Sequence, residues 1–250
     1  MLTRSHPVKS LLRNFGIELK RSAFGLDLRE DLKLFYAQCP PVVVFDIGAN
    51  HGQSALGLHD LFPAARIFSF EPASRTFGQL RKNVGHVPLI TPIQAALGGS
   101  EGSALLKITG ASVNTSILDY SKPGGLDRIC EQEEVPVRTV AGVCEERSLD
   151  HIDFMKVDTQ GFDLEVLRGA ERLFAGHRIR GVLTEVILVE LYENQARFHD
   201  ICAYMAGMGL QFCGLYGVHR ESDLFIHWAD ALFIDPAFKK GCSTEPSNQP

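Results

Sequence analysis

The fold is indicated by one stretch of the chain, Val42-Val-Val-Phe-Asp-Ile-Gly-Ala-Asn-His-Gly52. An apolar run that ends at turn residues is typical of a buried strand in a parallel sheet. Gly48 and Gly52 suit a tight turn that lets a ligand approach the backbone. Residues 53–62 then have apolar side chains at helical spacing and end before Pro63. Strand, glycine-rich turn and helix form the first unit of a nucleotide-binding α/β fold.

Length and composition fit a soluble protein with one large α/β domain. The chain has 250 residues, of which 45% are hydrophobic and 22% charged, and its net charge is −5. This charge gives no reason to expect a nucleic-acid partner. No apolar run approaches the ~18 residues of a membrane span. The basic N-terminus lacks the apolar core and cleavage site of a secretory signal, so a cytoplasmic location is expected.

The six cysteines are scattered, without a C-x-x-C pair, and the nine histidines form no metal-binding pair at helical spacing. A thiolate zinc site or a disulfide framework would need closer spacing. We therefore expect no metal, and we expect the cysteines to act as small buried apolar residues.

Three regions are expected along the chain: a helical N-terminal extension over residues 1–41, the α/β domain over 42–236 and a disordered tail over 237–250. The extension carries two amphipathic pieces, the second with Asp27 as N-cap. It either covers the active site or packs against the sheet. The basic first piece is compatible with weak peripheral membrane contact.

Two more strand–helix passes follow the opening unit. A strand over residues 66–70 ends at Glu71, Ser74 is the expected N-cap of the next helix, and a third strand covers 89–95. In a parallel sheet the ligand lies outside the carboxyl ends of the strands. The turn 48–52, Glu71 and Gln94-Ala95 should therefore meet at one edge.

The second half is expected to extend the sheet. Residues 98–102 resemble a hairpin loop leading to an antiparallel strand at 104–108, 110–136 form a long loop, and 137–140 a short strand. A buried strand over 152–158 ends at Asp158, and another strand carries Glu185. A helix over 198–208 and strands over 210–215 and 229–234 complete the domain.

The ligand-binding turn differs from a dinucleotide fingerprint, which requires G-x-G-x-x-G. Asn50 and Gln53 occupy the second and third glycine positions. The carboxylate of Glu71 can still accept both ribose hydroxyls. A ligand with ribose but no phosphate, such as S-adenosylmethionine, fits better than NAD.

Several motifs occur together in one order: Asp46-Ile-Gly-Ala-Asn-His-Gly52, Phe70-Glu-Pro72, Ala95-Ala-Leu-Gly98 and Lys156-Val-Asp-Thr-Gln-Gly-Phe-Asp163. Together they resemble the FkbM family of S-adenosylmethionine-dependent methyltransferases. The resemblance implies a class I, Rossmann-like fold with helices on both faces of a mostly parallel sheet. It implies methylation of a hydroxyl on a sugar, a polysaccharide precursor or a secondary metabolite. Gln160 and Asp163 stand where many members of the family carry Glu.

The resemblance also assigns roles to individual residues. Asp46 opens the cofactor motif, Glu71 binds the ribose, and Asp158 faces the methyl-transfer centre. The methionine end of the cofactor is assigned to Gly48, Ala49, Asn50 and Gly52, and the surroundings of the adenine to Gln94 and Ala95.

Methyl transfer from a sulfonium requires alignment of the acceptor oxygen and a group that takes its proton. The candidate bases are Asp158, Glu185 and His219. For Glu185 a structural hydrogen-bonding role is the alternative, and for His219 an exposed loop position. Asn50 is also a possible helix N-cap, and Tyr192 and Trp228 are expected to be packing or rim residues. Two other readings of the chain stay open: an NAD-dependent oxidoreductase and a non-catalytic S-adenosylmethionine-binding module.

Overall fold

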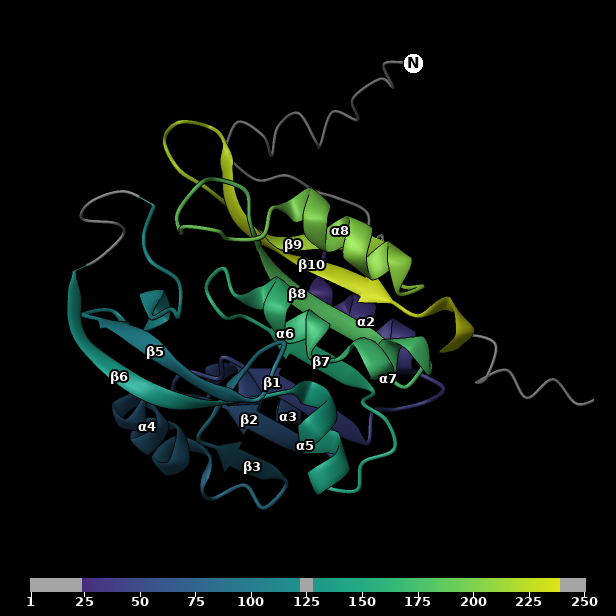
Figure 1. Cartoon of the computed structure of the whole chain (residues 1–250). Coiled ribbons are helices and arrows are strands. Elements are labelled where there is room, and N and C mark those ends of the chain that lie inside the picture. The colour runs from purple at the N-terminus through teal and green to yellow at the C-terminus, as the bar shows by residue number, and fades with distance from the viewer. Residues whose placement is uncertain (1–23, 122–127, 239–250) are drawn as a thin grey trace, which may run out of the picture.

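A seven-stranded sheet is the central element of the computed structural model, which describes residues 24–121 and 128–238 (Figure 1). Its strands are β1 (Val43–Ile47), β2 (Arg66–Phe70), β3 (Ile90–Ile93), β7 (Phe154–Val157), β8 (Gly181–Ile187), β9 (Gln211–Arg220) and β10 (Ile226–Ile234). The order is β3-β2-β1-β7-β8-β10-β9; β10 pairs antiparallel with both β8 and β9, and all the other pairs are parallel. The expected mostly parallel sheet is confirmed. Its order reverses between β1 and β7, where such sheets bind ligands.

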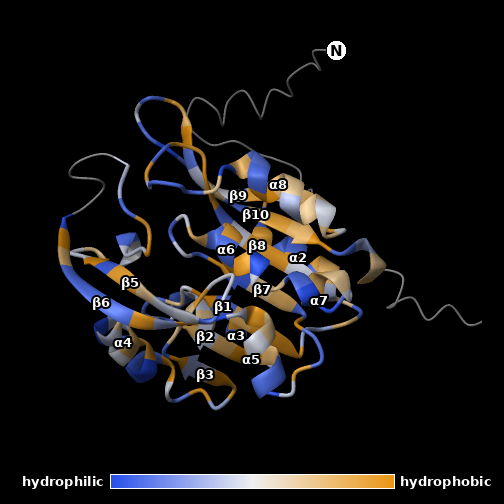
Figure 2. Cartoon of the chain, in the orientation of Figure 1, coloured by the Kyte–Doolittle hydropathy of each residue, from blue (hydrophilic) through white to orange (hydrophobic). Residues whose placement is uncertain are grey.

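Helices cover both faces of this sheet, as expected (Figure 1). One face is covered by α2 (Leu28–Tyr36), α3 (Gln53–Leu61) and α4 (Ser74–Val84), whose apolar residues share one core cluster. The other is covered by α5 (Val140–Glu146), α6 (Asp163–Arg168), α7 (Glu171–Ala175) and α8 (Phe198–Gly207). In Figure 2 the central strands are mainly hydrophobic, whereas the helices carry both hydrophobic and hydrophilic segments. This is the pattern of a sheet buried on both faces.

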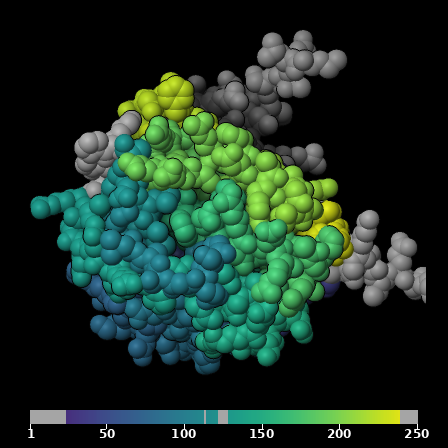
Figure 3. Space-filling view, in the orientation of Figure 1, coloured from purple at the N-terminus to yellow at the C-terminus, as the bar shows by residue number. Residues whose placement is uncertain are grey.

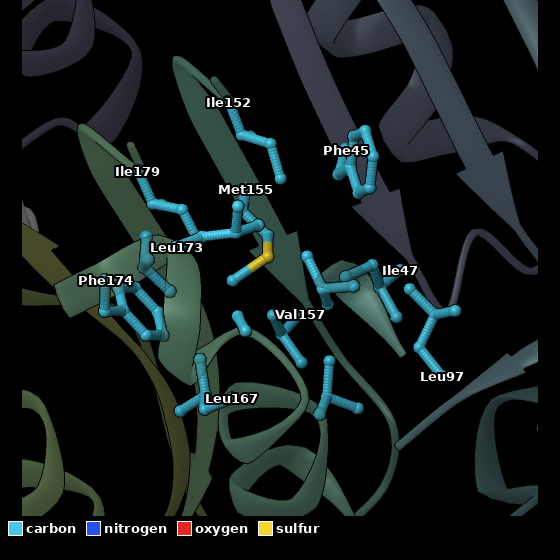
Figure 4. Packing of buried hydrophobic residues seen from close by; sticks show 14 of the residues in the cluster. Phe45, Ile47, Leu97, Ile152, Met155, Val157, Leu167, Leu173, Phe174 and Ile179 are labelled. Atoms are coloured by element: carbon cyan, nitrogen blue, oxygen red, sulfur yellow. The ribbon is translucent and has the colours of Figure 1, made fainter. Parts of the chain in front are cut away.

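The core beside β7 shows how tightly the layers pack. Met155 and Val157 are fully buried and lie against Leu167 and Phe174 of the covering helices (Figure 4). Each such side chain contributes roughly 1.5–3 kcal/mol by leaving water. β7 is therefore a fixed support for the polar residues that follow it.

Helix α2 packs on the sheet, the second of the two roles expected for the extension. Asp27 caps it by accepting from the Glu30 N–H, as predicted. Its Leu32 and Tyr36 are buried, and the Tyr36 hydroxyl donates to the Asp153 carbonyl at 2.6 Å. The first amphipathic piece and residues 239–250 of the predicted tail lie outside the described residues.

A second sheet contains β4 (Ala96–Leu97), β6 (Ile129–Arg138) and β5 (Gly102–Thr109), in that order. Residues 98–102 therefore do not close a hairpin, because β4 and β5 both pair with β6. The predicted long loop was also wrong over 129–136, which belong to β6. Along that part of β6 only Val135 is buried, so its polar outer half hid the strand period.

Smaller predictions also needed correction. The short strand expected at 137–140 is the end of β6 and the start of α5, whose N-cap Thr139 accepts from the Gly142 N–H. The N-caps of α3 and α4 are Gly52 and Ala73, not Asn50 and Ser74.

The cysteines and the membrane and metal expectations can be examined only within the described ranges. There, Cys39 is disulfide-bonded, which the cysteine spacing did not predict, and Cys144 is buried whereas Cys130 is exposed. Within 24–121 and 128–238 no helix is long and apolar enough to cross a bilayer. The same residues contain no cluster of three His, Cys, Asp or Glu side chains placed to hold a metal ion.

Candidate active site

A cavity of about 320 Å³ lies at the carboxyl ends of β1, β2, β7 and β8. On the face shown in Figure 3, the teal surface of the small sheet borders the green surface of the segments that follow β7. The cavity wall contains six of the residues selected from the sequence: Gly48, Asn50, Glu71, Ala95, Asp158 and Glu185. Its volume is within the usual range for small-molecule sites.

The turn after β1 is fixed by its own backbone. The Gly48 and Ala49 N–H groups both donate to the Phe70 carbonyl, at 3.0 and 2.9 Å. Gly48 has φ +78°, and a Cβ there would overlap the Asp158 carbonyl oxygen. Only glycine therefore lets β1 and the end of β7 approach this closely.

Glu71 is bound to the same turn. Its Oε2 accepts from the Asn50 N–H at 3.1 Å and its Oε1 from the Ala73 N–H at 2.9 Å. Burial raises the pKa of Glu71 to about 7, against the effect of these two donors. Each carboxylate oxygen has a further lone pair, so the group can still accept from a ligand in the cavity.

Asn50 connects the turn to a segment that the sequence did not place. Its φ is +48°, and its Oδ1 accepts from the Ser112 hydroxyl at 3.0 Å. Ser112 begins the short 3₁₀ helix η1 (Ser112–Asn114) and also lines the cavity. Part of the stretch expected to be a loop thus forms one wall of the site.

Four of the predicted cofactor residues do not line the cavity. Asp46 is buried beneath the turn, where its Oδ2 accepts from the Ser54 hydroxyl at 3.0 Å, and burial raises its pKa. Ala49 is buried in the core, and a Cβ on Gly52 would touch Leu80 and Val84. Gln94 is exposed, with its amide donating to the Ser74 hydroxyl at 2.8 Å. Asp46, Ala49 and Gly52 shape the turn from behind.

The opposite wall contains the two candidate catalytic carboxylates. Asp158 follows β7, and its Oδ2 lies 3.0 Å from the Lys156 ammonium. Glu185 lies on β8, and its pKa is raised well above the usual range by burial and by the neighbouring carboxylates Asp158 and Asp163. The structure therefore brings together the two carboxylates that the sequence selected separately.

Lys156 and Gln160 contact these carboxylates but were not selected as site residues. Burial opposes the charge on Lys156, but nearby Asp158 and Asp46 raise its pKa. Gln160 donates to Asp158 Oδ1 at 3.3 Å and to Glu185 Oε2 at 2.8 Å. Strand alternation could have identified Lys156, since residues two apart share a face.

Asp163 closes the turn that follows Asp158. Its two oxygens accept from the Thr159 and Gly161 N–H groups, each at 3.1 Å. Burial, followed by repulsion from Asp158, raises the pKa of Asp163 to about 7. Asp163 thus shapes the turn that carries Gln160.

Of the aromatic candidates, Trp228 lies in the cavity wall and Tyr192 in the core. Trp228 lines the cavity, with the His219 ring stacked on it at 3.8 Å and 12°. His219 belongs to β9, not to a loop, and its Nε2 lies 3.1 Å from Glu221. Tyr192 is buried, as expected for a packing residue, and its hydroxyl donates to Gln160 Oε1 at 2.9 Å.

Comparison with known proteins identifies the family. The model of the methyltransferase FkbM domain matches residues 46–213. The chain is 25% identical over 196 residues to 2-O-methyltransferase NoeI of Sinorhizobium fredii, covering 74% of this chain and 79% of that protein. It is 26% identical over 130 residues to hexuronic acid methyltransferase AglP of Haloferax volcanii, covering 51% of this chain and about half, 49%, of that protein.

Solved structures are more distant. Magnesium protoporphyrin IX methyltransferase (ChlM) from Synechocystis PCC 6803, solved with bound SAM, aligns with a TM-score of 0.46 and 12% identity, covering 82% of this chain and 77% of that chain. The family match extends over more than half of the sequence and includes both walls of the cavity. The chain therefore belongs to the methyltransferase FkbM domain family and is a methyltransferase.

Proposed function

We propose that this protein binds S-adenosylmethionine in the cavity and transfers its methyl group to a hydroxyl of a sugar or a saccharide precursor. The observation that carries the proposal is that one cavity is lined both by the turn with Glu71 and by the carboxylates Asp158 and Glu185. The names of two relatives, a 2-O-methyltransferase and a hexuronic acid methyltransferase, support this acceptor class. The proposed catalytic domain spans residues 42–236, preceded by the extension 1–41.

The cofactor end of the cavity is formed by Gly48, Asn50, Glu71 and Ala95. Gly48 lines the cavity and, having no side chain, presents its backbone to a ligand there. The spare lone pairs of the Glu71 carboxylate suit a vicinal diol such as ribose. Ala95 offers a small apolar surface that a flat base could cover.

The acceptor end is formed by Asp158, Glu185 and the side chains around them. When bound, S-adenosylmethionine supplies an electrophilic methyl group on a positively charged sulfur. Asp158, which is about one-third exposed, orients the acceptor hydroxyl and takes its proton. Glu185 hydrogen-bonds the acceptor or its neighbouring oxygen. The surrounding walls exclude water, which would otherwise compete for position.

Calorimetric titration with S-adenosylmethionine and with NAD tests the cofactor assignment. We expect binding of the first and none of the second. Glu71→Ala should weaken binding by about 1–3 kcal/mol through loss of charged hydrogen bonds. Glu145→Ala is the matched control, because Glu145 is exposed and pairs with Arg172 on the surface, away from the cavity. Binding of NAD alone, or equal affinity in both variants, would contradict the assignment.

The acceptor class is tested by mass spectrometry. Wild-type protein with S-adenosylmethionine is incubated with neutral saccharides, uronic-acid saccharides and non-sugar alcohols. A mass gain of one methyl group on a saccharide is expected. Methylation confined to the non-sugar alcohols would exclude the proposed acceptor but keep the methyltransferase activity. Cofactor binding without any transfer would support a non-catalytic binding module.

A further inference from the structure

Gln160 lies between the two carboxylates of the acceptor end. It follows β7 in the left-handed conformation, with φ +53°, which is uncommon for a residue other than glycine. This backbone conformation directs its amide nitrogen to Glu185 Oε2 at 2.8 Å and to Asp158 Oδ1 at 3.3 Å. One amide group therefore contacts both candidate catalytic residues.

The orientation of this amide is fixed from its other side. The buried Tyr192 hydroxyl donates to Gln160 Oε1 at 2.9 Å. An amide oxygen only accepts, so this bond leaves both N–H donors of the side chain for the carboxylates. Tyr192 is stacked on Tyr120, with ring centres 5.2 Å apart and planes at 18°. The Ser116 hydroxyl donates to the backbone carbonyl of Gln160 at 2.8 Å.

Gln160 thus connects the reacting end of the cavity to two segments far apart in the chain. Ser116 and Tyr120 belong to the stretch after β5, and Tyr192 belongs to the stretch between β8 and α8. Both stretches supply residues to the cavity wall. The first stretch contacts the Gln160 backbone carbonyl through Ser116, and the second contacts its side chain through Tyr192.

The charges around Asp158 and Glu185 show what the Gln160 amide contributes there. Lys156 on β7 pairs with Asp158. Asp163 on α6 and Asp230 on β10 are further carboxylates near Glu185. Asp46 on β1 lies near Lys156. Two carboxylates at one site repel each other when both are ionised. The Gln160 amide gives each of them a hydrogen bond without adding negative charge.

We propose that Gln160 is a positioning residue for methyl transfer, whose amide, oriented by Tyr192, holds Asp158 and Glu185 together at the acceptor hydroxyl. The proposal rests on the proposed function of the same cavity. It assigns to Gln160 an effect on the reaction through the two carboxylates, without direct contact with the methyl group.

The decisive variant is Gln160→Met, which keeps the length of the side chain but removes the donor amide. We expect kcat at neutral pH to fall about tenfold or more, with KM for S-adenosylmethionine changed less than about threefold. The acidic limb of the kcat profile should move upward by about one pH unit, because the ionised carboxylates lose the hydrogen bonds that favour their charged form. Gln79→Met, an exposed change on α4, is the matched control.

A second variant tests the orientation itself. Tyr192→Phe removes only the hydroxyl that fixes the Gln160 amide, and kcat should fall about two- to fivefold with KM for the cofactor unchanged. A merely structural role would lower the thermal midpoint of either variant without moving the pH profile. If Gln160→Met has the wild-type profile of kcat against pH, the proposal is overturned.

A readout without catalysis separates this proposal from the acceptor assignment. Trp228 is the only tryptophan of the chain and lines the cavity. In a His219→Phe background, which removes the imidazole stacked on Trp228, its fluorescence reports on ionisation in the cavity. The midpoint of its pH titration should be higher in Gln160→Met than in the parent protein and in Gln79→Met. If no saccharide is methylated, the proposed acceptor class is wrong, while a higher midpoint still supports the role of Gln160 beside Asp158 and Glu185. An unchanged midpoint overturns that role.

Discussion

The cofactor end and the acceptor end of the cavity are held in different ways. At the cofactor end, backbone N–H groups of the turn after β1 bind the end of β2, through the Phe70 carbonyl and the Glu71 carboxylate. At the acceptor end, Gln160, which follows β7, donates to Glu185 on β8. Tyr192 and Ser116, from two covering segments, donate to the side-chain and backbone oxygens of Gln160. A substitution at the cofactor end should therefore disturb a rigid backbone, whereas one at the acceptor end should alter the chemistry and leave the fold intact.

The largest effect is expected at the acceptor end. Asp158→Asn removes the proposed base but keeps a side chain of the same shape, so kcat should fall about 10²–10⁴-fold. Cofactor affinity, measured by calorimetry, should change little, because Asp158 is not part of the cofactor end. The matched control is Asp60→Asn, an exposed change on α3. A wild-type kcat in Asp158→Asn would remove this residue from the reaction.

The next effect is expected at Gly48, where the two ends meet. A Cβ in Gly48→Ala would overlap the Asp158 carbonyl in a backbone conformation that disfavours alanine. The free energy of unfolding should fall by about 3 kcal/mol, with loss of cofactor binding. Urea unfolding and calorimetry measure both quantities.

Gly57→Ala provides the control for that change. Gly57 lies within α3, and a Cβ there meets nothing within 4 Å. Alanine favours a helix interior, so this variant should be as stable as the wild type or more stable by about 0.5–1 kcal/mol. Equal losses in the two variants would mean that the close approach at Gly48 is not what makes glycine necessary.

The same contrast explains what the sequence could predict. The cofactor end follows from local patterns: the apolar run of β1, the turn with Gly48, and Glu71 directly after β2. The parallel pairing of the first strands follows from the alternation of strands and helices, and these strands were placed within a few residues. These features depend on neighbours in sequence, which periodicity reports directly.

The acceptor end depends on contacts that no local pattern reports. Gln160 meets Tyr192 and Ser116, which lie 32 and 44 residues away in the chain. The strand β6 was missed because its outer half is exposed, and α5 because it is a single short helix over seven residues. Gln94 was assigned to the cofactor from its position in the sequence. Its hydrogen bond to Ser74 holds its side chain outside the cavity wall.

The pH dependence of stability tests the buried carboxylate of the cofactor end. Burial raises the pKa of Glu71 in the folded state to about 7, from an ordinary value of 4.5. Folding therefore favours the protonated form, so this contribution is fully present below about pH 4.5 and is lost as the pH rises through 7. The loss amounts to about 3 kcal/mol from this group.

Urea unfolding of the cofactor-free protein between pH 4.5 and 8 measures this loss. Glu71→Gln cannot ionise at this position. The free energy of unfolding of the wild type should therefore fall relative to that of the variant as the pH rises. Cofactor binding should follow the opposite trend, because the ionised carboxylate accepts stronger hydrogen bonds. Parallel pH curves for the two proteins would show that Glu71 does not titrate in this range.

The smallest effect is expected at Gln94, and it sets the boundary of the cofactor end. The side chain is exposed, and its amide donates to the Ser74 hydroxyl at 2.8 Å, away from the cavity wall that Ala95 forms. Gln94→Ala should therefore change cofactor affinity less than about threefold, or about 0.6 kcal/mol. A loss as large as that of Glu71→Ala would mean that Gln94 turns from Ser74 to the ligand on binding. The cofactor end would then also depend on a mobile side chain, and its contrast with the acceptor end would be one of degree.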